Sequence, residues 1–428
     1  MNQFKKLNNI AGWVVFLIAS FVYFSTIEQT VSFWDCGEYI ATAYKLEVGH
    51  PPGAPFFQLF GRIFTLFAAQ GTSEVAVAIN IMSALCSSFT ILFLFWTITA
   101  FGRKMFFKDE KNIEFGSIIA VLGSGLVGAL AYTFSDSFWF SAVEGEVYAM
   151  SSLFTAVTFW CIMKWEQEAD KPHASRWLVL IGYLIGLSVG VHLLGILTIP
   201  AMGMIYYYKK YEYSKSGAIK AFIISMIMLG LVQGVIIPGA VSLISKFELF
   251  FVNTIGLPFN SGTIIYFLTI IAAIAFGLSY TKKHNKAIWN TAILGIMMLL
   301  IGYSSFAILV VRSNANPPID ENNPEDAVGL LSYLKREQYG SWPIVYGQHF
   351  NAKLDSRKPY IDGNPVYAKD EKKGKYVVID KRKNSIPNYS KKDKMLFPRI
   401  WSNTQARHAG GYVNWAGLKN KDAKFHIK

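Results

Sequence analysis

A series of long apolar stretches in the first 311 residues limits the chain's fold more than any other sequence feature. A helix needs about 20 residues to cross the ~30 Å hydrocarbon core of a bilayer. The candidate stretches are residues 10–24, 75–101, 117–134, 148–163, 177–208, 218–244, 263–280 and 287–311. We therefore predict an all-α polytopic membrane protein.

Two of the apolar segments need separate treatment. Residues 177–208 are too long for one crossing, and the cluster of Gly190, His192 and Gly195 predicts two short helices that meet there. Residues 56–69 are shorter and include Gln58 and Arg62, which favours an interfacial amphipathic helix. These assignments predict about nine transmembrane helices.

The positions of the basic residues predict how the chain is oriented. If the amino terminus is cytoplasmic, 16 Lys and Arg of the first 311 residues lie in inside loops and 3 lie in outside loops. Basic residues hold their loops on the cytoplasmic side during insertion, so we expect this orientation. The loops after Ser25, after Ser135 and around His192 are then outside, with everything after Val311. Had residues 56–69 crossed the membrane, every later loop would change sides.

The tail differs in composition from the rest of the chain. Residues 1–311 form the predicted transmembrane domain, and residues 312–428 form a soluble segment with sparse apolar residues. Helical spacing of Val328, Leu331 and Leu334, with apolar runs at 343–347 and 376–380, predicts a small mixed α/β unit. The tail contains 22 of the 41 basic residues and 12 acids, which suits anionic lipid or glycan surfaces. No nucleic-acid-binding module is present, so we predict no nucleic-acid partner.

The first predicted outside loop contains two acids three residues apart, Asp35 and Glu38, between the aromatic residues Trp34 and Tyr39. Residues at this spacing share one face of a helical turn. Such a pair can hold an acceptor hydroxyl and take its proton. The alternative is structural: Asp35 caps a short helix and Glu38 occupies its third position. His50 opens a proline-rich turn that is either a stiff connector or a contact for a phosphate.

The second predicted outside loop places Glu144, Glu146 and Tyr148 at the start of a span. The helix dipole alone favours acids there. Carboxylates at membrane depth are costly, however, and usually functional. Glu144 and Glu146 could orient a substrate, or bind a divalent cation together with Asp35. His192 is either a packing residue or, if it reaches a cavity, a contact for a lipid phosphate.

Several motifs together resemble a known family. They are Trp34–Tyr39, the turn at 50–53, the loop at 144–148, residues 190–192, and the segments 316–320 and 330–340. In this combination they look like a bacterial membrane family that is similar to the protein O-mannosyltransferases. Those enzymes belong with the polyprenyl-phosphate-dependent glycosyltransferases of the C-type fold (GT-C).

The resemblance implies a membrane enzyme that transfers a sugar, with mannose as the expected one, from a polyprenyl-phosphate donor. The acceptor is a Ser or Thr hydroxyl of a secreted or membrane protein on the outer face. By position, Asp35 is the implied catalytic base and Glu38 its partner. Trp34, Tyr39, His50, Glu144, Glu146, Tyr148 and His192 are the candidate substrate contacts. The implied location is the bacterial inner membrane, with membrane lipid around the spans and a periplasmic tail. Family members often continue well beyond this length, which leaves open that the chain is a fragment.

Two other function classes compete with the enzyme. A transporter or flippase also uses intramembrane acids and a broken helix, but it would spread acids through the depth of the bundle. A scaffold or assembly factor would keep its function without Asp35, Glu38, Glu144 and Glu146. The clustering of these acids at one predicted surface favours the enzyme.

Overall fold

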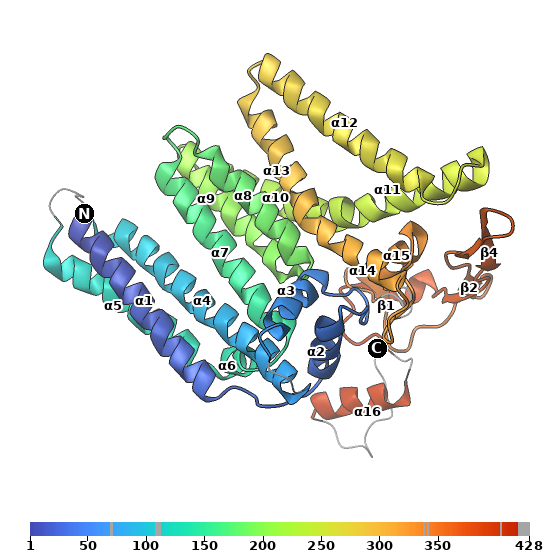
Figure 1. Cartoon of the computed structure of the whole chain (residues 1–428), viewed down its shortest axis with the longest axis horizontal. Helices are drawn as coiled ribbons and strands as arrows, with labels where there is room; N and C mark the ends of the chain where they lie inside the picture. Colours follow the sequence, from blue (N-terminus) through green and yellow to red (C-terminus); the bar gives the residue numbers. More distant parts are fainter. Residues whose placement is uncertain (69–71, 108–112, 337–338, 340–341, 403–404, 418–428) are drawn as a thin grey trace. The chain divides into compact units, whose positions relative to one another are not determined.

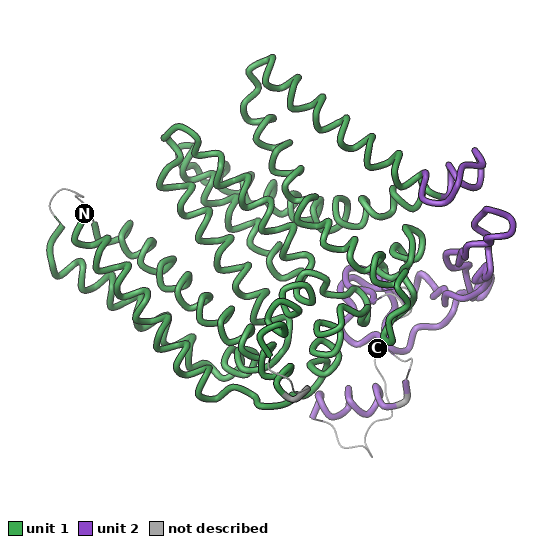
Figure 2. The backbone as a smooth tube through the Cα atoms, in the orientation of Figure 1, with its two compact units in different colours: residues 1–248, 262–335 green, residues 249–261, 336–428 purple. Residues whose placement is uncertain are grey.

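The structure is a computed structural model that describes residues 1–68, 72–107, 113–336, 339, 342–402 and 405–417. It contains two compact units (Figure 2): residues 1–248 with 262–335, and residues 249–261 with 336–428. By packing, residues 312–335 therefore group with the helical unit. The predicted limit of the membrane domain at residue 311 stays a prediction.

The first unit is helical (Figure 1). Its α-helices are α1 Asn2–Ser25, α2 Cys36–Lys45, α3 Pro55–Thr65, α4 Thr72–Phe106, α5 Phe115–Thr133, α6 Asp136–Ala142, α7 Val147–Glu168, α8 Ser175–Val189, α9 Ile199–Lys210, α10 Lys215–Leu231, α11 Ile237–Leu249, α12 Ser261–Lys283, α13 Ala287–Tyr303, α14 Ala307–Ser313 and α15 Ala327–Leu334. Short 3-10 segments lie at Leu193–Thr198 and Ser304–Phe306, and a π-helical segment lies at Val232–Ile236. A second π-helical segment, Phe250–Ile255, belongs to the second unit.

The helices form where the apolar stretches predicted them. Among the described residues, seven helical segments are long and apolar enough to cross a membrane. Helix α8 is shorter, and the long apolar run breaks after Gly190 as predicted, with α9 following the 3-10 turn. The count of nine spans stays a prediction. Helix α3 is a separate short helix, as expected for residues 56–69, of which residue 69 lies outside the described residues.

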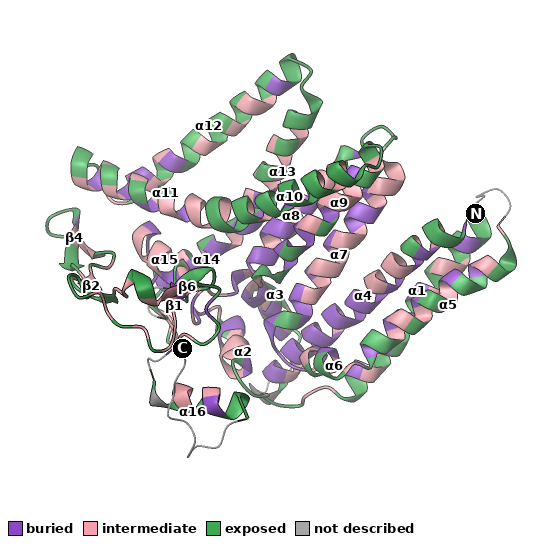
Figure 3. Ribbon diagram, turned by 180° about the vertical axis from the view of Figure 1, so that it is seen from behind, coloured by how far each residue is buried: buried purple, intermediate pink, exposed green. Residues whose placement is uncertain are grey.

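Burial differs strongly between the helices (Figure 3). In the most apolar window of α4, 67% of the residues are buried, whereas the value for α12 is 11%. The outward residues of α12 are nevertheless apolar, including Ile264, Leu268 and Ile271. Exposed apolar helices of this kind are suited to lipid rather than to water. The structure thus supports a membrane protein.

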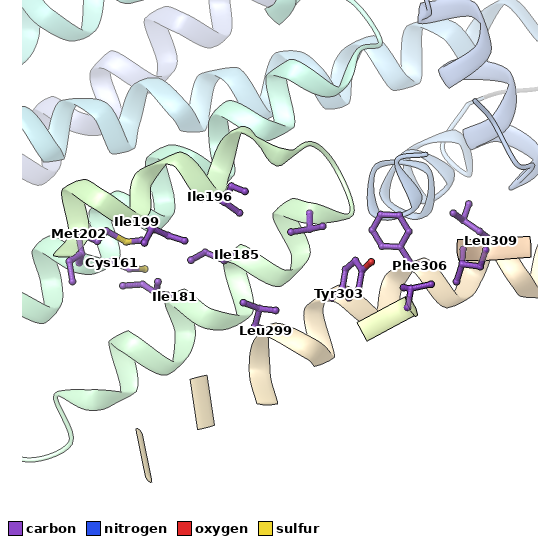
Figure 4. Packing of buried hydrophobic residues seen from close by; sticks show 14 of the residues in the cluster. Cys161, Ile181, Ile185, Ile196, Ile199, Met202, Leu299, Tyr303, Phe306 and Leu309 are labelled. Atoms are coloured by element: carbon purple, nitrogen blue, oxygen red, sulfur yellow. The ribbon is translucent and has the colours of Figure 1, made fainter. Parts of the chain in front are cut away.

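Helices α8 and α13 pack closely because glycines face each other across them. A side chain at Gly186 would overlap the backbone of Leu299, and one at Gly302 would overlap that of Tyr183. Small residues allow such close backbone approach in membrane bundles. The adjoining core includes Ile181, Ile185, Ile196, Leu299, Tyr303, Phe306 and Leu309 (Figure 4).

The second unit contains three two-stranded antiparallel sheets, β1–β6, β2–β5 and β3–β4. The strands are β1 Tyr346–Gln348, β2 Tyr360–Ile361, β3 Val366–Asp370, β4 Lys375–Asp380, β5 Ile386–Pro387 and β6 Lys394–Leu396, with a 3-10 turn at Lys391–Asp393 and α16 at Ala406–Trp415. The Asn253 side chain exchanges two hydrogen bonds with the Tyr376 backbone, which ties residues 249–261 to β4. A small strand-containing C-terminal region is therefore confirmed.

Candidate active site

The acids and histidines predicted as site residues come together at one end of the helical unit. Asp35 follows α1 and precedes α2, whereas Glu146 precedes α7. The Glu28 N–H donates to the Val143 carbonyl at 3.1 Å, which joins the two loops. The Phe56 N–H donates to the Gly190 carbonyl at 2.8 Å and so brings in the loop of His192.

His50 lies between the two acids of the first loop. Its Nδ1 is 3.0 Å from Glu38 Oε1, and its backbone N–H donates to the same oxygen at 2.5 Å. Its Nε2 is 3.8 Å from Asp35 Oδ2. The hydrogen bond with Glu38 raises the pKa of His50 above its ordinary value, against the effect of burial. Burial of Glu38 opposes ionisation, but the hydrogen bonds from His50 outweigh it and lower the pKa of that carboxyl.

Asp35 is the open member of this trio. Its side chain is 59% exposed, compared with 27% for Glu38 and 22% for His50. Asp35 occupies the N-cap position of α2 as predicted, but its carboxylate makes no capping hydrogen bond. Glu38, at the third position, binds His50 instead of completing a capping box. The carboxylate of Asp35 is thus left facing outward.

The aromatic candidates surround the two histidines. The Tyr39 ring lies 5.6 Å from that of His50, and the Tyr148 ring lies 5.5 Å from that of His192. Trp34 is 89% exposed beside Asp35. His192 Nδ1 accepts from the Leu194 N–H, which places the proton of the neutral ring on Nε2. Burial lowers the pKa of His192, so the ring is neutral near pH 7.

Glu144 and Glu146 are both buried. Glu146 caps α7 by accepting from the Val147 N–H at 3.1 Å. Burial raises the pKa of Glu146 to about 7, and the negative charges of Asp35 and Glu144 act in the same direction. Glu144 lies beside Ser32 and Cys36, and its Oε2 has no hydrogen-bond partner among the described residues. Burial raises the pKa of Glu144 as well.

The sequence suggested that Asp35, Glu144 and Glu146 could bind a divalent cation. Within the described ranges, no three His, Cys, Asp or Glu side chains are grouped so as to hold an ion. Glu146 accepts from the Val147 N–H at the start of α7. The suggested divalent cation at Asp35, Glu144 and Glu146 stays a prediction, and no chemical step is derived through it.

The structure adds residues that the sequence did not single out individually. Val48 forms a parallel bridge with Asp320, and the Tyr333 hydroxyl donates to the Gly49 carbonyl at 2.6 Å. A side-chain carbon at Gly49 would lie only 2.5 Å from Glu38 Oε1. The segments 316–320 and 330–340, which appeared only as motifs, therefore include residues that hold the turn of His50. Residues 337, 338 and 340 lie outside the described part.

Comparisons with known proteins match two parts of the chain. Residues 35–215 match the model of the Protein O-mannosyl-transferase TMEM260 N-terminal domain, and residues 340–426 match a family of unknown function (DUF8416). A Protein O-mannosyl-transferase tmem260 of Dictyostelium discoideum is 29% identical over 34% of this chain and 16% of its own length. The TMEM260 protein of Mus musculus is 25% identical over 41% of this chain and 22% of its own.

The chain is therefore similar to protein O-mannosyltransferases over residues 35–215, which include every predicted site residue except Trp34. The match therefore spans only about a fifth of the length of each relative, 16% of the Dictyostelium discoideum protein and 22% of the Mus musculus protein. No solved structure matches the chain significantly.

Proposed function

We propose that this chain is the membrane part of a glycosyltransferase with its active site at Asp35. It moves a mannose from a polyprenyl-phosphate carrier to a Ser or Thr hydroxyl of a protein at the outer face of the bacterial inner membrane. The observation that supports this most is an exposed carboxylate, Asp35, beside a histidine held by a second carboxylate. The similarity to protein O-mannosyltransferases covers the same residues.

The transfer inverts the sugar at its anomeric carbon. Asp35 takes the proton of the acceptor hydroxyl as its oxygen forms a bond to that carbon. The bond from the anomeric carbon to the phosphate oxygen breaks, and its electron pair leaves with the polyprenyl phosphate. Because a phosphate is a good leaving group, the site needs a base and donors near the phosphate rather than a second carboxylate acting as acid.

The neighbouring residues then take distinct roles. His50, whose pKa is raised by Glu38, supplies a positive ring 3.8 Å from Asp35 and orients that carboxylate. Glu38 holds His50 in place through this hydrogen bond and does not itself take a proton from the acceptor. His192 presents a neutral Nε2–H that can donate to the phosphate. Trp34, Tyr39 and Tyr148 offer aromatic surface to the sugar and the acceptor.

The donor can be tested with purified protein in liposomes. Radiolabelled mannose is supplied either as polyprenyl-phosphate mannose or as the nucleotide sugar, with a Ser/Thr-rich peptide as acceptor. We expect label in the peptide only from the lipid-linked donor, and no label in a Ser/Thr-to-Ala peptide. Transfer from the nucleotide sugar would contradict the donor assignment. Ion-dependent uptake of a solute without transfer would favour the transporter.

A further inference from the structure

A cavity of about 450 Å³ lies at the opposite end of the same helices from the acids. It is lined by the first residues of α1, the last turns of α4 and α7, and Lys171. Asp35 and Glu146, in contrast, adjoin the other ends of α1 and α7. The cavity is therefore no part of the proposed transfer site. By the charge rule, this end faces the cytoplasm.

Positive charge predominates around the cavity. Among the described residues, four basic side chains line it, Lys5, Arg103, Lys164 and Lys171, together with one acid, Glu168. Glu168 accepts hydrogen bonds from Arg176 and Trp177, both outside the lining. Lys5, Arg103 and Lys164 come from three different helices and line the same hollow. An anion in this hollow would therefore lie close to several positive side chains, which favours its binding.

The cavity wall is aromatic and offers polar groups. The Trp96 and Trp160 rings lie 6.0 Å apart, and Lys164 Nζ lies 5.0 Å from the Trp160 ring centre. Trp96 Nε1 and Asn8 Oδ1 are buried without hydrogen-bond partners among the described residues. Buried polar atoms without partners are rare in folded proteins. A hollow lined by both aromatic rings and cations suits an amphiphilic anion.

We propose that this cavity binds the phosphate headgroup of a membrane lipid. The phosphate lies among Lys5, Arg103 and Lys164, because Lys and Arg donate charge-assisted hydrogen bonds to phosphate. The apolar part of the lipid packs on Trp96 and Trp160. Basic residues at the cytoplasmic ends of spans commonly meet anionic headgroups, but the hollow and its orphaned polar atoms indicate a defined site rather than a diffuse attraction.

Native mass spectrometry of the full chain in detergent tests the proposal. The probes are phosphatidylglycerol, phosphatidylcholine and inorganic phosphate. For wild type we expect phosphatidylglycerol to bind tightest and to resist competition by millimolar inorganic phosphate. The double variant Arg103→Gln/Lys164→Gln should bind phosphatidylglycerol about 10-fold more weakly. The matched control is Lys282→Gln/Lys283→Gln, which removes the same charge at the end of α12, outside the cavity.

A second variant separates the hollow from the charge. Ala100→Phe fills the cavity and keeps every cation, so it should also weaken phosphatidylglycerol binding. Melting temperatures without added lipid show whether each variant is folded. The proposal is overturned if the control loses as much binding as the cavity variant, or if a folded Ala100→Phe binds as wild type does. Displacement of the lipid by inorganic phosphate would show a free-phosphate site and would also overturn it.

Discussion

The two ends of helices α1 and α7 use charge in opposite ways. At the Asp35 end, the carboxylates of Glu38 and Glu146 are held by nearby donors, Glu144 is buried, and the Asp35 side chain is 59% exposed. At the other end, four cations surround a hollow. A reactive group needs fixed neighbours, because catalysis depends on precise positioning. A binding site for an anion needs mainly a surplus of positive charge and space.

The comparison is tested most severely by altering the neighbours of Asp35 without altering Asp35 itself. Gly49→Ala would place a carbon 2.5 Å from Glu38 Oε1 and push that carboxylate away from His50. Misplacement of about 1 Å costs about 100-fold in rate, and we expect that loss in mannosyl transfer. The control is Gly116→Ala in α5, where an added carbon meets nothing within 4 Å. Full activity in Gly49→Ala would show that the Glu38–His50 contact is dispensable.

The burial of acids at this end has a consequence for stability. The pKa of Glu146 is raised to about 7 by burial, then by the charges of Asp35 and Glu144. Its contribution to stability is thus fully present below pH ~4.5 and is lost as the pH rises through about 7. Glu146→Gln should remove this decline and be about 3 kcal/mol more stable than wild type at pH 8.

Unfolding in detergent at pH 5 and pH 8 measures this difference. Glu114→Gln, at the exposed start of α5, is the control and should follow wild type at both values. An equal stability of Glu146→Gln and wild type at pH 8 would contradict the proposed cost of the buried charge.

The positive ring of His50 gives a smaller, pH-dependent effect. Its pKa is raised by the hydrogen bond with Glu38, so the ring is charged below that pKa and loses its charge above it. We expect His50→Gln to lower kcat about 10-fold at neutral pH, equivalent to about 1.4 kcal/mol. The wild-type rate should fall on the alkaline side, and the variant should lack that fall. Identical pH profiles for the two proteins would show that the charge of the His50 ring does not contribute to the rate.

The smallest effect is expected for Tyr333, which is distant in sequence and holds the turn of His50. Tyr333→Phe removes the hydroxyl that donates to the Gly49 carbonyl at 2.6 Å. Loss of one buried hydrogen bond costs about 1 kcal/mol, visible as a small decrease in unfolding free energy. Tyr208→Phe, at the exposed end of α9, should be neutral. If both variants were equally stable, the contact would not contribute to holding the turn.

The sequence predicted the helices well because apolar length and turn residues are local signals. The break after Gly190, the short helix α3 and the helix containing Leu331 all formed as expected. The partners of Glu38 were not predicted. Its position three residues after Asp35 suggested a capping box, whereas the folded turn offers it His50.

That difference has a physical cause. The turn of His50 is held by Asp320 and Tyr333, which lie more than 250 residues further along the chain. Spacing within one loop gives no information on such contacts. The basic cavity was missed for the same reason, since Lys5, Arg103 and Lys164 lie on three helices and were counted only as charges that orient the chain.

The central claim is that Asp35 is the base for sugar transfer. It is tested most directly by mannosyl transfer from polyprenyl-phosphate mannose in liposomes, comparing Asp35→Asn with Asp136→Asn. Asp136 is an exposed acid in the first turn of α6, at the same end of the bundle. Removal of a general base costs about 100-fold or more, so Asp35→Asn should lose transfer at least to that extent while remaining folded, and Asp136→Asn should keep it. Equal transfer by both variants would contradict the claim.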